Sequence, residues 1–222
     1  AALIDGRSLK YKYQDIPTCW EEYCPRNFAE NYQGKITLVD AFKTSSNIVP
    51  IKITEELELK TIIELAKTFG LGNEQKYEEV LPLAIGSFGD TLLNITNVYS
   101  TLNNNGIFLE TSIIQKIESY EGNLIWIHDP YQERIIPTNI AKQAKILLEK
   151  SVSEGSSMGA RINGEKVFGK TGTSDGNRDL WFIGSIKDLT TGIWLGLDNN
   201  QETSLSSGNS SNLWKLYNLQ IR

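Results

Sequence analysis

Histidine and cysteine are scarce in this sequence of 222 residues, which has one histidine and two cysteines. So few ligands cannot build a zinc site without several carboxylates, and we expect neither a metal nor another cofactor. Long hydrophobic runs are missing as well: no stretch of about 18 apolar residues is present, so no membrane span is expected within the chain. Basic runs are also absent and the formal net charge is −5, which argues against a nucleic-acid partner.

The composition is that of an ordinary soluble globular protein, with 40% apolar and 22% charged residues. The length predicts one large domain, or one domain with a small lobe. A chain of this size can bury a core without the help of disulfides or metals.

The two cysteines, Cys19 and Cys24, lie in a polar and irregular segment at residues 7–36. No further cysteine and no histidine pair accompanies them, so zinc binding is not expected there. Two alternatives stay open for them: a local disulfide formed in an oxidising compartment, or two free thiols.

The start of the chain has no methionine, no signal peptide and no helix-capping residue. Residues 1–4 have the pattern of the last turn of a helix that ends at Gly6, and glycine is the residue type expected at that position. We therefore expect the sequence to be a fragment whose upstream part is missing. A processed or trimmed N-terminus is the alternative.

Capping residues and hydrophobic periodicity predict several helices before residue 151. Thr37, followed three positions later by Asp40, predicts a helix start, and the short polar side chains at 44–47 predict its end. Pro50 is compatible with the first turn of a second helix. Further helices are predicted at 55–69, at 91–104 and at 138–150, with Thr138 as the cap of the last one.

Short stretches with a period of two residues predict strands. A hairpin is expected from 107–118 and 124–128, joined at 121–123. Loops are predicted at 151–163 and 203–212, and a short closing helix at 213–221. Three more strands are predicted at 165–170, 179–186 and 191–198, the last two paired antiparallel. Helices followed by an antiparallel sheet define an α+β fold.

Two short motifs could carry chemistry. Lys170-Thr171-Gly172-Thr173 ends a predicted strand, and Ser45-Ser46-Asn47 lies between two predicted helices. Either motif alone is a weak signal, because such strings occur in ordinary turns. Together they offer a cation, hydroxyls, an amide and a backbone N–H, a set that suits a ligand with a carboxylate and an adjacent amide. Gly172 would let the backbone approach that ligand closely, and the N–H of Thr173 would supply half of an oxyanion hole.

These motifs are the second and third signatures of serine acyl-transferases that act on D-alanyl peptides and β-lactams. With them, the chain resembles the C-terminal two-thirds or more of the transpeptidase domain of class A penicillin-binding proteins. Other segments carry the same resemblance along the chain: 25–28, 34–38, 83–86, 97–106, 168–174, 177–184 and 192–200. The resemblance implies a penicillin-binding-protein or serine β-lactamase-like fold, incomplete at its N-terminus. It would have a helical lobe at about 37–160 and a C-terminal sheet and helix at about 164–222.

The resemblance also implies a role for each motif residue. Ser45 would take part in proton transfer, and Asn47 would hold the acyl side-chain amide and the catalytic lysine of the family. Lys170 would lie beside Ser45 and set a positive field. Thr171 and Thr173 would bind the terminal carboxylate next to Gly172, and the N–H of Thr173 would polarise the scissile carbonyl.

The first signature of the family, Ser-x-x-Lys, does not occur in this sequence; Ser8-Leu9-Lys10 has the wrong spacing for one helix face. In the family this signature precedes the stretch that residues 1–4 resemble, so the attacking serine would lie two or three helical turns before Ala1. A glycosyltransferase domain and a membrane anchor would lie further upstream. We expect the chain alone to be inactive and poorly soluble, since losing a central helix exposes apolar surface.

The resemblance implies a peptidoglycan D,D-transpeptidase that binds D-Ala-D-Ala stem peptides and β-lactam antibiotics on the periplasmic or extracytoplasmic face of the inner membrane. Two alternatives stay open: a non-catalytic module that binds cell-wall peptides, and a β-lactamase or β-lactam sensor. Arg178 and Asp179 are expected to pair locally, either at the mouth of the site or in a purely structural role. His128 is expected to be a surface residue of the predicted hairpin.

Overall fold

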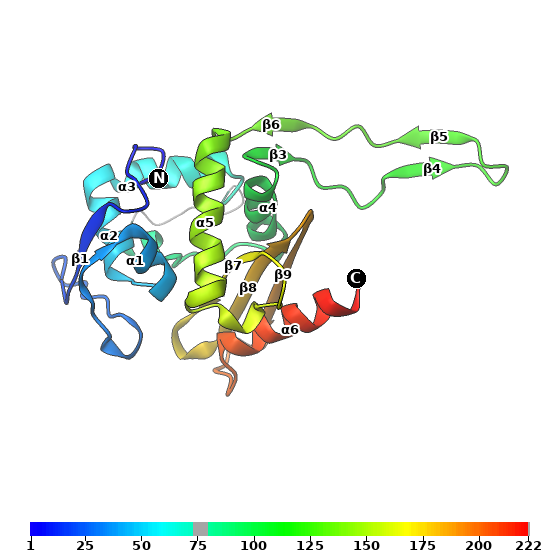
Figure 1. The fold of residues 1–222 in the computed structure, drawn as a ribbon. Helices are drawn as coiled ribbons and strands as arrows, with labels where there is room; N and C mark the ends of the chain where they lie inside the picture. Colours follow the sequence, from blue (N-terminus) through cyan, green and yellow to red (C-terminus); the bar gives the residue numbers. More distant parts are fainter. Residues whose placement is uncertain (73–79, 222) are drawn as a thin grey trace.

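A computed structural model describes residues 1–72 and 80–221 of the chain. In Figure 1, helix α5 (Thr138–Glu154) crosses in front of a sheet formed by β7, β8 and β9, with α6 below it. Helices α1, α2 and α3 lie on one side of α5, and a long hairpin projects away on the other side. No helix in these two described ranges is both long and apolar enough to cross a membrane.

The N-terminal part joins a small two-stranded sheet to three helices. Strands β1 (Lys12–Asp15) and β2 (Gly34–Thr37) are antiparallel, and β2 leads directly into α1 (Leu38–Thr44). The predicted start at Thr37 is confirmed, because its side chain accepts a hydrogen bond from the N–H of Asp40. Helix α2 (Ile48–Leu57) is separated from α3 (Leu59–Thr68) by Glu58, whose φ is 66°. The helix predicted at 55–69 therefore begins too early, since this left-handed residue ends one helix before the next begins.

Helix α4 (Leu92–Asn103) begins after Thr91, whose side chain accepts from the N–H of Asn94, and the predicted bounds are confirmed. Helix α5 differs from its prediction at both ends. Thr138 is its first helical residue, whereas the N-cap is Pro137, and the Thr138 hydroxyl instead accepts from Arg134. The helix also continues four residues beyond Lys150, into the stretch predicted as a loop.

The projecting hairpin consists of β4 (Lys116–Glu118) and β5 (Leu124–Ile127), joined by the predicted turn (Figure 1). At its base, β3 (Ile107–Leu109) pairs with β6 (Gln132–Arg134). The single strand predicted at 107–118 is therefore two short strands, and β6 was not predicted. Most side chains of this arm are exposed, so the burial that normally fixes a strand pattern is missing from it. His128 follows β5 and is half-buried.

The main sheet has the order β7-β8-β9, with β7 (Val167–Thr173), β8 (Asp179–Ile186) and β9 (Leu189–Gly196) all antiparallel. Helix α4 packs on one face, where Gly192 lies against Leu92 and Thr96. Helix α6 (Ser207–Gln220) covers the other face through Trp214, whose ring meets that of Phe182 edge-on at 5.2 Å. Helix α6 begins six residues earlier than predicted, because Ser206 and Asn209 form a capping box in a stretch rich in loop-favouring residues.

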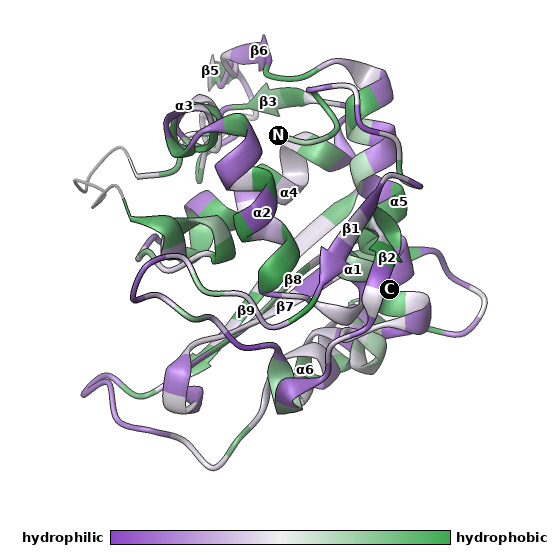
Figure 2. Ribbon diagram, turned by 90° about the vertical axis from the view of Figure 1, so that its left-hand side faces the viewer, coloured by the Kyte–Doolittle hydropathy of each residue, from purple (hydrophilic) through white to green (hydrophobic). Residues whose placement is uncertain are grey.

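The buried side chains gather in two clusters, one on each side of α5. The first joins the start of the chain to β1, β2, α1, α2 and α5, and its buried members are Ala2, Leu3, Tyr13, Ile36, Leu38, Ala41, Val49 and Leu147. The second lies between the sheet and α6 and is built around Phe182 and Trp214. In Figure 2 the helices carry both green and purple positions, as expected of helices with one buried side.

Candidate functional site

The Ser45 turn ends α1 and redirects the chain. Ser45 adopts φ 58° and ψ 47°, a left-handed conformation that is uncommon outside glycine. The N–H of Ser46 donates to the carbonyl of Ala41 at 2.9 Å, a bond typical of helices that end in this way. The break predicted at 44–47 is thereby confirmed, and the Ser45 side chain is turned away from the axis of α1.

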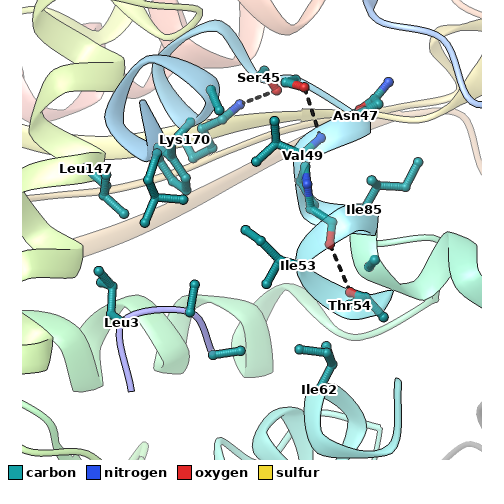
Figure 3. A pocket seen from close by; sticks show the side chains of 18 of the residues that line it. Leu3, Ser45, Asn47, Val49, Ile53, Thr54, Ile62, Ile85, Leu147 and Lys170 are labelled. Carbon is teal, nitrogen blue, oxygen red and sulfur yellow. Dashed lines mark hydrogen bonds between the residues drawn. The ribbon is translucent and has the colours of Figure 1, made fainter. Parts of the chain in front are cut away.

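Lys170 on β7 meets this turn directly. Its Nζ donates to the Ser45 hydroxyl at 2.9 Å and to the carbonyl of Thr171 at 3.1 Å (Figure 3). Burial lowers the pKa of Lys170 to about 8. A lysine with this pKa can be charged or neutral near neutral pH, so it can bind an anion and can also take part in proton transfer.

The exposed edge of β7 is fixed by a pair of buried serines. Ser151 on α5 donates to the hydroxyl of Ser157 at 2.8 Å, and Ser157 accepts the N–H of Thr171 at 3.1 Å. The N–H of Thr171 therefore points away from β8. Because strand residues two apart have the same orientation, the N–H of Thr173 points to this outer edge as well. The loop predicted at 151–163 could line a substrate groove, but its sequence did not indicate this hydrogen bond of Ser157.

Asn47 lies at the start of α2, on the same turn as Ser45. Its side-chain amide donates to the carbonyl of Arg26 at 2.7 Å, and its backbone N–H donates to the Asn27 side chain at 2.8 Å. The segment around Asn27 therefore fixes the orientation of Asn47. The sequence motif at 25–28 carried part of the family resemblance, but nothing in it indicated this contact.

A cavity of about 460 Å³ brings the two motifs together. Ser45, Asn47, Lys170 and Thr171 line one part of it. The rest is largely apolar and includes the first residues of the chain (Figure 3). Its apolar lining residues are Ala1, Ala2, Leu3, Leu38, Ala41, Phe42, Val49, Pro50, Ile53, Ile62, Ala84, Ile85 and Leu147. Asn47 and Lys170 thus face one common space, as the combined motifs require.

A second cavity, of about 450 Å³, adjoins the first along β7. Lys170 and Thr171 line both cavities, whereas Gly172 and Thr173 line only the second. A side chain at Gly172 would lie 3.3 Å from Cβ of Trp181, so the crowding at this glycine comes from the neighbouring strand. The six predicted site residues, Ser45, Asn47, Lys170, Thr171, Gly172 and Thr173, therefore all line one or both of these cavities.

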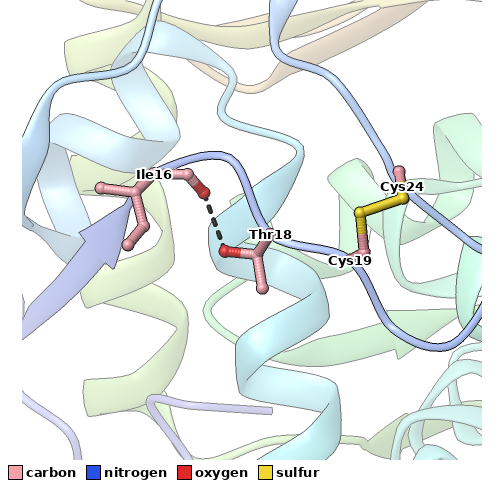
Figure 4. The surroundings of a disulfide bond; sticks show 4 residues. All are labelled: Ile16, Thr18, Cys19 and Cys24. Atoms are coloured by element: carbon pink, nitrogen blue, oxygen red, sulfur yellow. Dashed lines mark hydrogen bonds between the residues drawn. A yellow bond between two sulfur atoms is a disulfide. The ribbon is translucent and has the colours of Figure 1, made fainter.

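A disulfide joins Cys19 to Cys24 in the segment between β1 and β2 (Figure 4). Of the two alternatives for these residues, the bonded form is the one observed. Burial and the nearby Asp175 carboxylate both raise the pKa of Tyr23, which lies inside the disulfide loop. This loop therefore faces the segment that directly follows Thr173.

Arg178 and Asp179 do not pair with each other, contrary to the expectation. The Asp179 carboxylate accepts from the Ser174 hydroxyl at 3.0 Å and from the Trp194 indole at 2.9 Å. The Arg178 guanidinium lies 3.8 Å from Glu202. Arg178 precedes β8 and ends the 3-10 turn at Asp175–Asn177, so its side chain is directed to Glu202 and the Asp179 carboxylate to Ser174 and Trp194.

In the described part of the chain, no group of three or more histidine, cysteine, aspartate or glutamate side chains could hold a metal ion. The chemistry available at the β7 edge is therefore that of a buried lysine, hydroxyls, amides and backbone N–H groups.

The fold and the meeting of a Ser-x-Asn turn with a Lys-Thr-Gly strand define a class: the architecture is that of penicillin-binding transpeptidase domains. Penicillin-binding protein 1A from Haemophilus influenzae superposes with a TM-score of 0.87 at 20% identity, over 96% of this chain and 39% of that one. The PonA1 protein from Mycobacterium tuberculosis, solved in complex with penicillin V, gives 0.85 at 20% identity over 96% of this chain and 64% of that one.

Residues 7–213 match the family model of the penicillin binding protein transpeptidase domain, and the chain belongs to this family. Among curated relatives, penicillin-binding protein 4 of Bacillus subtilis is 29% identical over 182 residues, covering 81% of this chain and 29% of the relative. Penicillin-binding protein 1B of Haemophilus influenzae is 30% identical over 190 residues, covering 84% of this chain and 24% of the relative. The chain thus spans less than a third of the length of these two relatives.

Proposed function

We propose that this chain supplies most of the active site of a peptidoglycan D,D-transpeptidase, which cross-links cell-wall peptides through an acyl-serine intermediate. The observation that carries the proposal is the hydrogen bond of 2.9 Å between Lys170 Nζ and the Ser45 hydroxyl. It joins the two signatures at a cavity, and a buried lysine beside a hydroxyl is suited to proton transfer and to anion binding.

The substrate would lie along the outer edge of β7. Lys170, with the hydroxyls of Thr171 and Thr173, would bind the terminal carboxylate of a D-Ala-D-Ala stem peptide or of a β-lactam. The N–H of Thr173 would donate to the scissile carbonyl oxygen as negative charge develops on it. Asn47, across the cavity, would hold the amide of the acyl side chain.

The attacking serine would come from a segment that precedes Ala1. The cavity supports this, because its apolar part adjoins Ala1, Ala2 and Leu3 while its polar part holds Ser45 and Lys170. A helix that continues backwards from Ala1 would cover apolar side chains such as Leu147 and could place a Ser-x-x-Lys pair beside Ser45. Without that segment the chain has no attacking group and would be inactive.

The reaction would proceed in two steps. The serine hydroxyl loses its proton as its oxygen bonds to the carbonyl carbon of the penultimate D-Ala, the C–N bond breaks, and that proton passes through the Lys170–Ser45 contact to the amine of the released D-Ala. An amine of a neighbouring stem peptide then attacks the ester carbonyl, loses a proton, and returns the serine hydroxyl. A β-lactam would acylate the same serine.

The intact protein would be anchored in the inner membrane and act on its periplasmic or extracytoplasmic face, with a glycosyltransferase domain upstream. The disulfide between Cys19 and Cys24 supports this location, since disulfides persist in oxidising compartments.

The test is labelling of the longer protein, including its upstream Ser-x-x-Lys segment, by a fluorescent penicillin. We expect covalent labelling that Lys170→Ala reduces by at least about 100-fold, because both the anion site and the contact with Ser45 are lost. The matched control is Lys187→Ala on the exposed turn between β8 and β9, which should label normally. Absence of labelling in the unmodified protein would contradict the proposal.

The same labelling experiment separates two other functions from the proposed one. A non-catalytic module would bind D-Ala-D-Ala peptides reversibly along β7 without forming an adduct. Fast turnover of a chromogenic β-lactam would instead identify a β-lactamase.

A further inference from the structure

Asp15, at the end of β1, is a carboxylate that is only 1% exposed. Three hydrogen bonds satisfy it: one oxygen accepts from the Asn27 amide at 2.8 Å and from the Ser46 hydroxyl at 2.7 Å, and the other accepts from the N–H of Gln33 at 3.1 Å. None of the ion pairs within residues 1–72 and 80–221 includes Asp15. The Asp15 carboxyl group therefore accepts its hydrogen bonds from uncharged donors.

Two of these donors lead directly to the Ser45–Asn47 turn. Ser46 is the central residue of the turn, and its hydroxyl also accepts the N–H of Val49 in the first turn of α2. The Asn27 side chain, whose amide donates to Asp15, accepts the backbone N–H of Asn47. Asp15 is thus connected to this turn in two ways, directly through Ser46 and indirectly through Asn27.

The same network bears on the Asn47 side chain. Its amide donates to the carbonyl of Arg26, the residue before Asn27. If Asn27 shifts, the backbone N–H and the side-chain amide of Asn47 both lose their partners. Both contacts of Asn47 therefore depend on the segment at 26–27, and that segment and the turn would rearrange together.

We propose that Asp15 is a positioning residue for the transpeptidase site, which it serves by fixing Asn47 through Ser46 and Asn27. This inference rests on the proposed function for its consequence in acylation. Asp15 itself lies behind the turn and lines neither of the two cavities at β7.

The experiment uses the longer protein and measures the second-order rate constant of acylation by fluorescent penicillin together with the melting temperature. Asp15→Ala should lower the rate constant by roughly 10- to 100-fold, because small displacements of a positioned group have effects of this size. In an Asn47→Ala background the same change should lower the rate less than about threefold, since Asp15 acts through Asn47. Its effect on the melting temperature should be the same in both backgrounds.

Asp15→Asn is the conservative variant. Its single oxygen can still accept from Asn27 and Ser46, and only the N–H of Gln33 loses its acceptor. We therefore expect it to melt earlier and yet to acylate within about threefold of the unmodified rate. If Asp15→Ala does not fold, Ser46→Ala removes the same contact from the side of the turn and should also slow acylation. The matched control is Asn218→Ala in α6, which removes a buried hydrogen bond to Trp214 and should lower stability alone.

A merely structural role predicts other results: an Asp15→Ala rate like that of the unmodified protein, or an equal loss with and without Asn47. Either result overturns the proposal. If the unmodified protein does not acylate at all, the proposed function fails, and Asp15 is judged by hydrogen exchange at residues 45–49. Faster exchange in Asp15→Ala than in Asn218→Ala then supports the positioning role, and equal exchange refutes it.

Discussion

Lys170 and Ser45 are 125 positions apart in the chain and share a hydrogen bond of 2.9 Å. The contact ties the edge of the main sheet to the turn between α1 and α2. It forms because a left-handed residue ends α1 and because the side chain of Lys170 extends from β7 toward that turn. The proposed chemistry depends on this pair.

The pH dependence of carboxylate binding should report on Lys170. Burial lowers its pKa to about 8, so the amine is charged below that pH and neutral above it. A bound carboxylate favours the charged form and raises the pKa, so the affinity should fall by up to about tenfold per pH unit above pH 8. Titration of a D-Ala-D-Ala peptide between pH 6 and 10 measures this.

The control for this titration is Lys170→Arg, because a guanidinium stays charged over the whole range. The affinity of this variant for the peptide should therefore not fall between pH 8 and pH 10. An unmodified protein whose affinity is flat up to pH 10 would show that Lys170 does not bind the carboxylate.

Ser157 should matter for stability as well as for the shape of the β7 edge. Ser157→Ala leaves the N–H of half-buried Thr171 and the buried hydroxyl of Ser151 without their partner. We expect a loss of about 1–3 kcal/mol in the free energy of unfolding, measured by urea denaturation. Ser112→Ala, at an exposed site, should change it by less than about 0.5 kcal/mol. Equal effects of the two variants would rule out the role assigned to Ser157.

Much of the helical framework could be predicted from the sequence because capping is local. Thr37 and Thr91 each act within three residues, and both helix starts are where their side chains indicate. The start of α6 could not be predicted in this way. Ser206 and Asn209 form an equally local capping box, but they lie in a stretch whose residue types favour loops, so the cap alone did not indicate a helix.

In the candidate site, too, some residues could be predicted from the sequence and others could not. The two motifs could be predicted from their residues and from the family resemblance. Asp15 could not, because its donors Gln33 and Ser46 are 18 and 31 positions away and nothing in the local sequence pairs them. Buried polar networks of this kind depend on tertiary packing, which periodicity does not encode.

The disulfide between Cys19 and Cys24 should stabilise the loop that faces the end of β7. In the chain-entropy account, closing so short a loop lowers the conformational entropy of the unfolded chain and so stabilises the folded protein by about 2 kcal/mol. The double variant Cys19→Ser/Cys24→Ser should lose about that much unfolding free energy, and a reductant should have no further effect on it. An unmodified protein whose stability does not respond to reductant would contradict this prediction.

The apolar cavity beside Leu3 should lower the solubility of the isolated chain. Half-buried apolar side chains such as Ile53 and Ile62 line this cavity, and apolar surface of this kind promotes association. We expect the 222-residue chain to bind a hydrophobic dye and to melt gradually. A longer protein that includes the helix proposed to precede Ala1 should melt sharply and at higher temperature. A sharp cooperative melt of the short chain would contradict the expectation.

The most direct measurement is to locate the penicilloyl adduct by peptide mass spectrometry after the longer protein has reacted with penicillin. The account predicts one modified serine, in a Ser-x-x-Lys sequence upstream of Ala1, and none in the residues printed here. An adduct on Ser45 or on any other residue of this chain would contradict it.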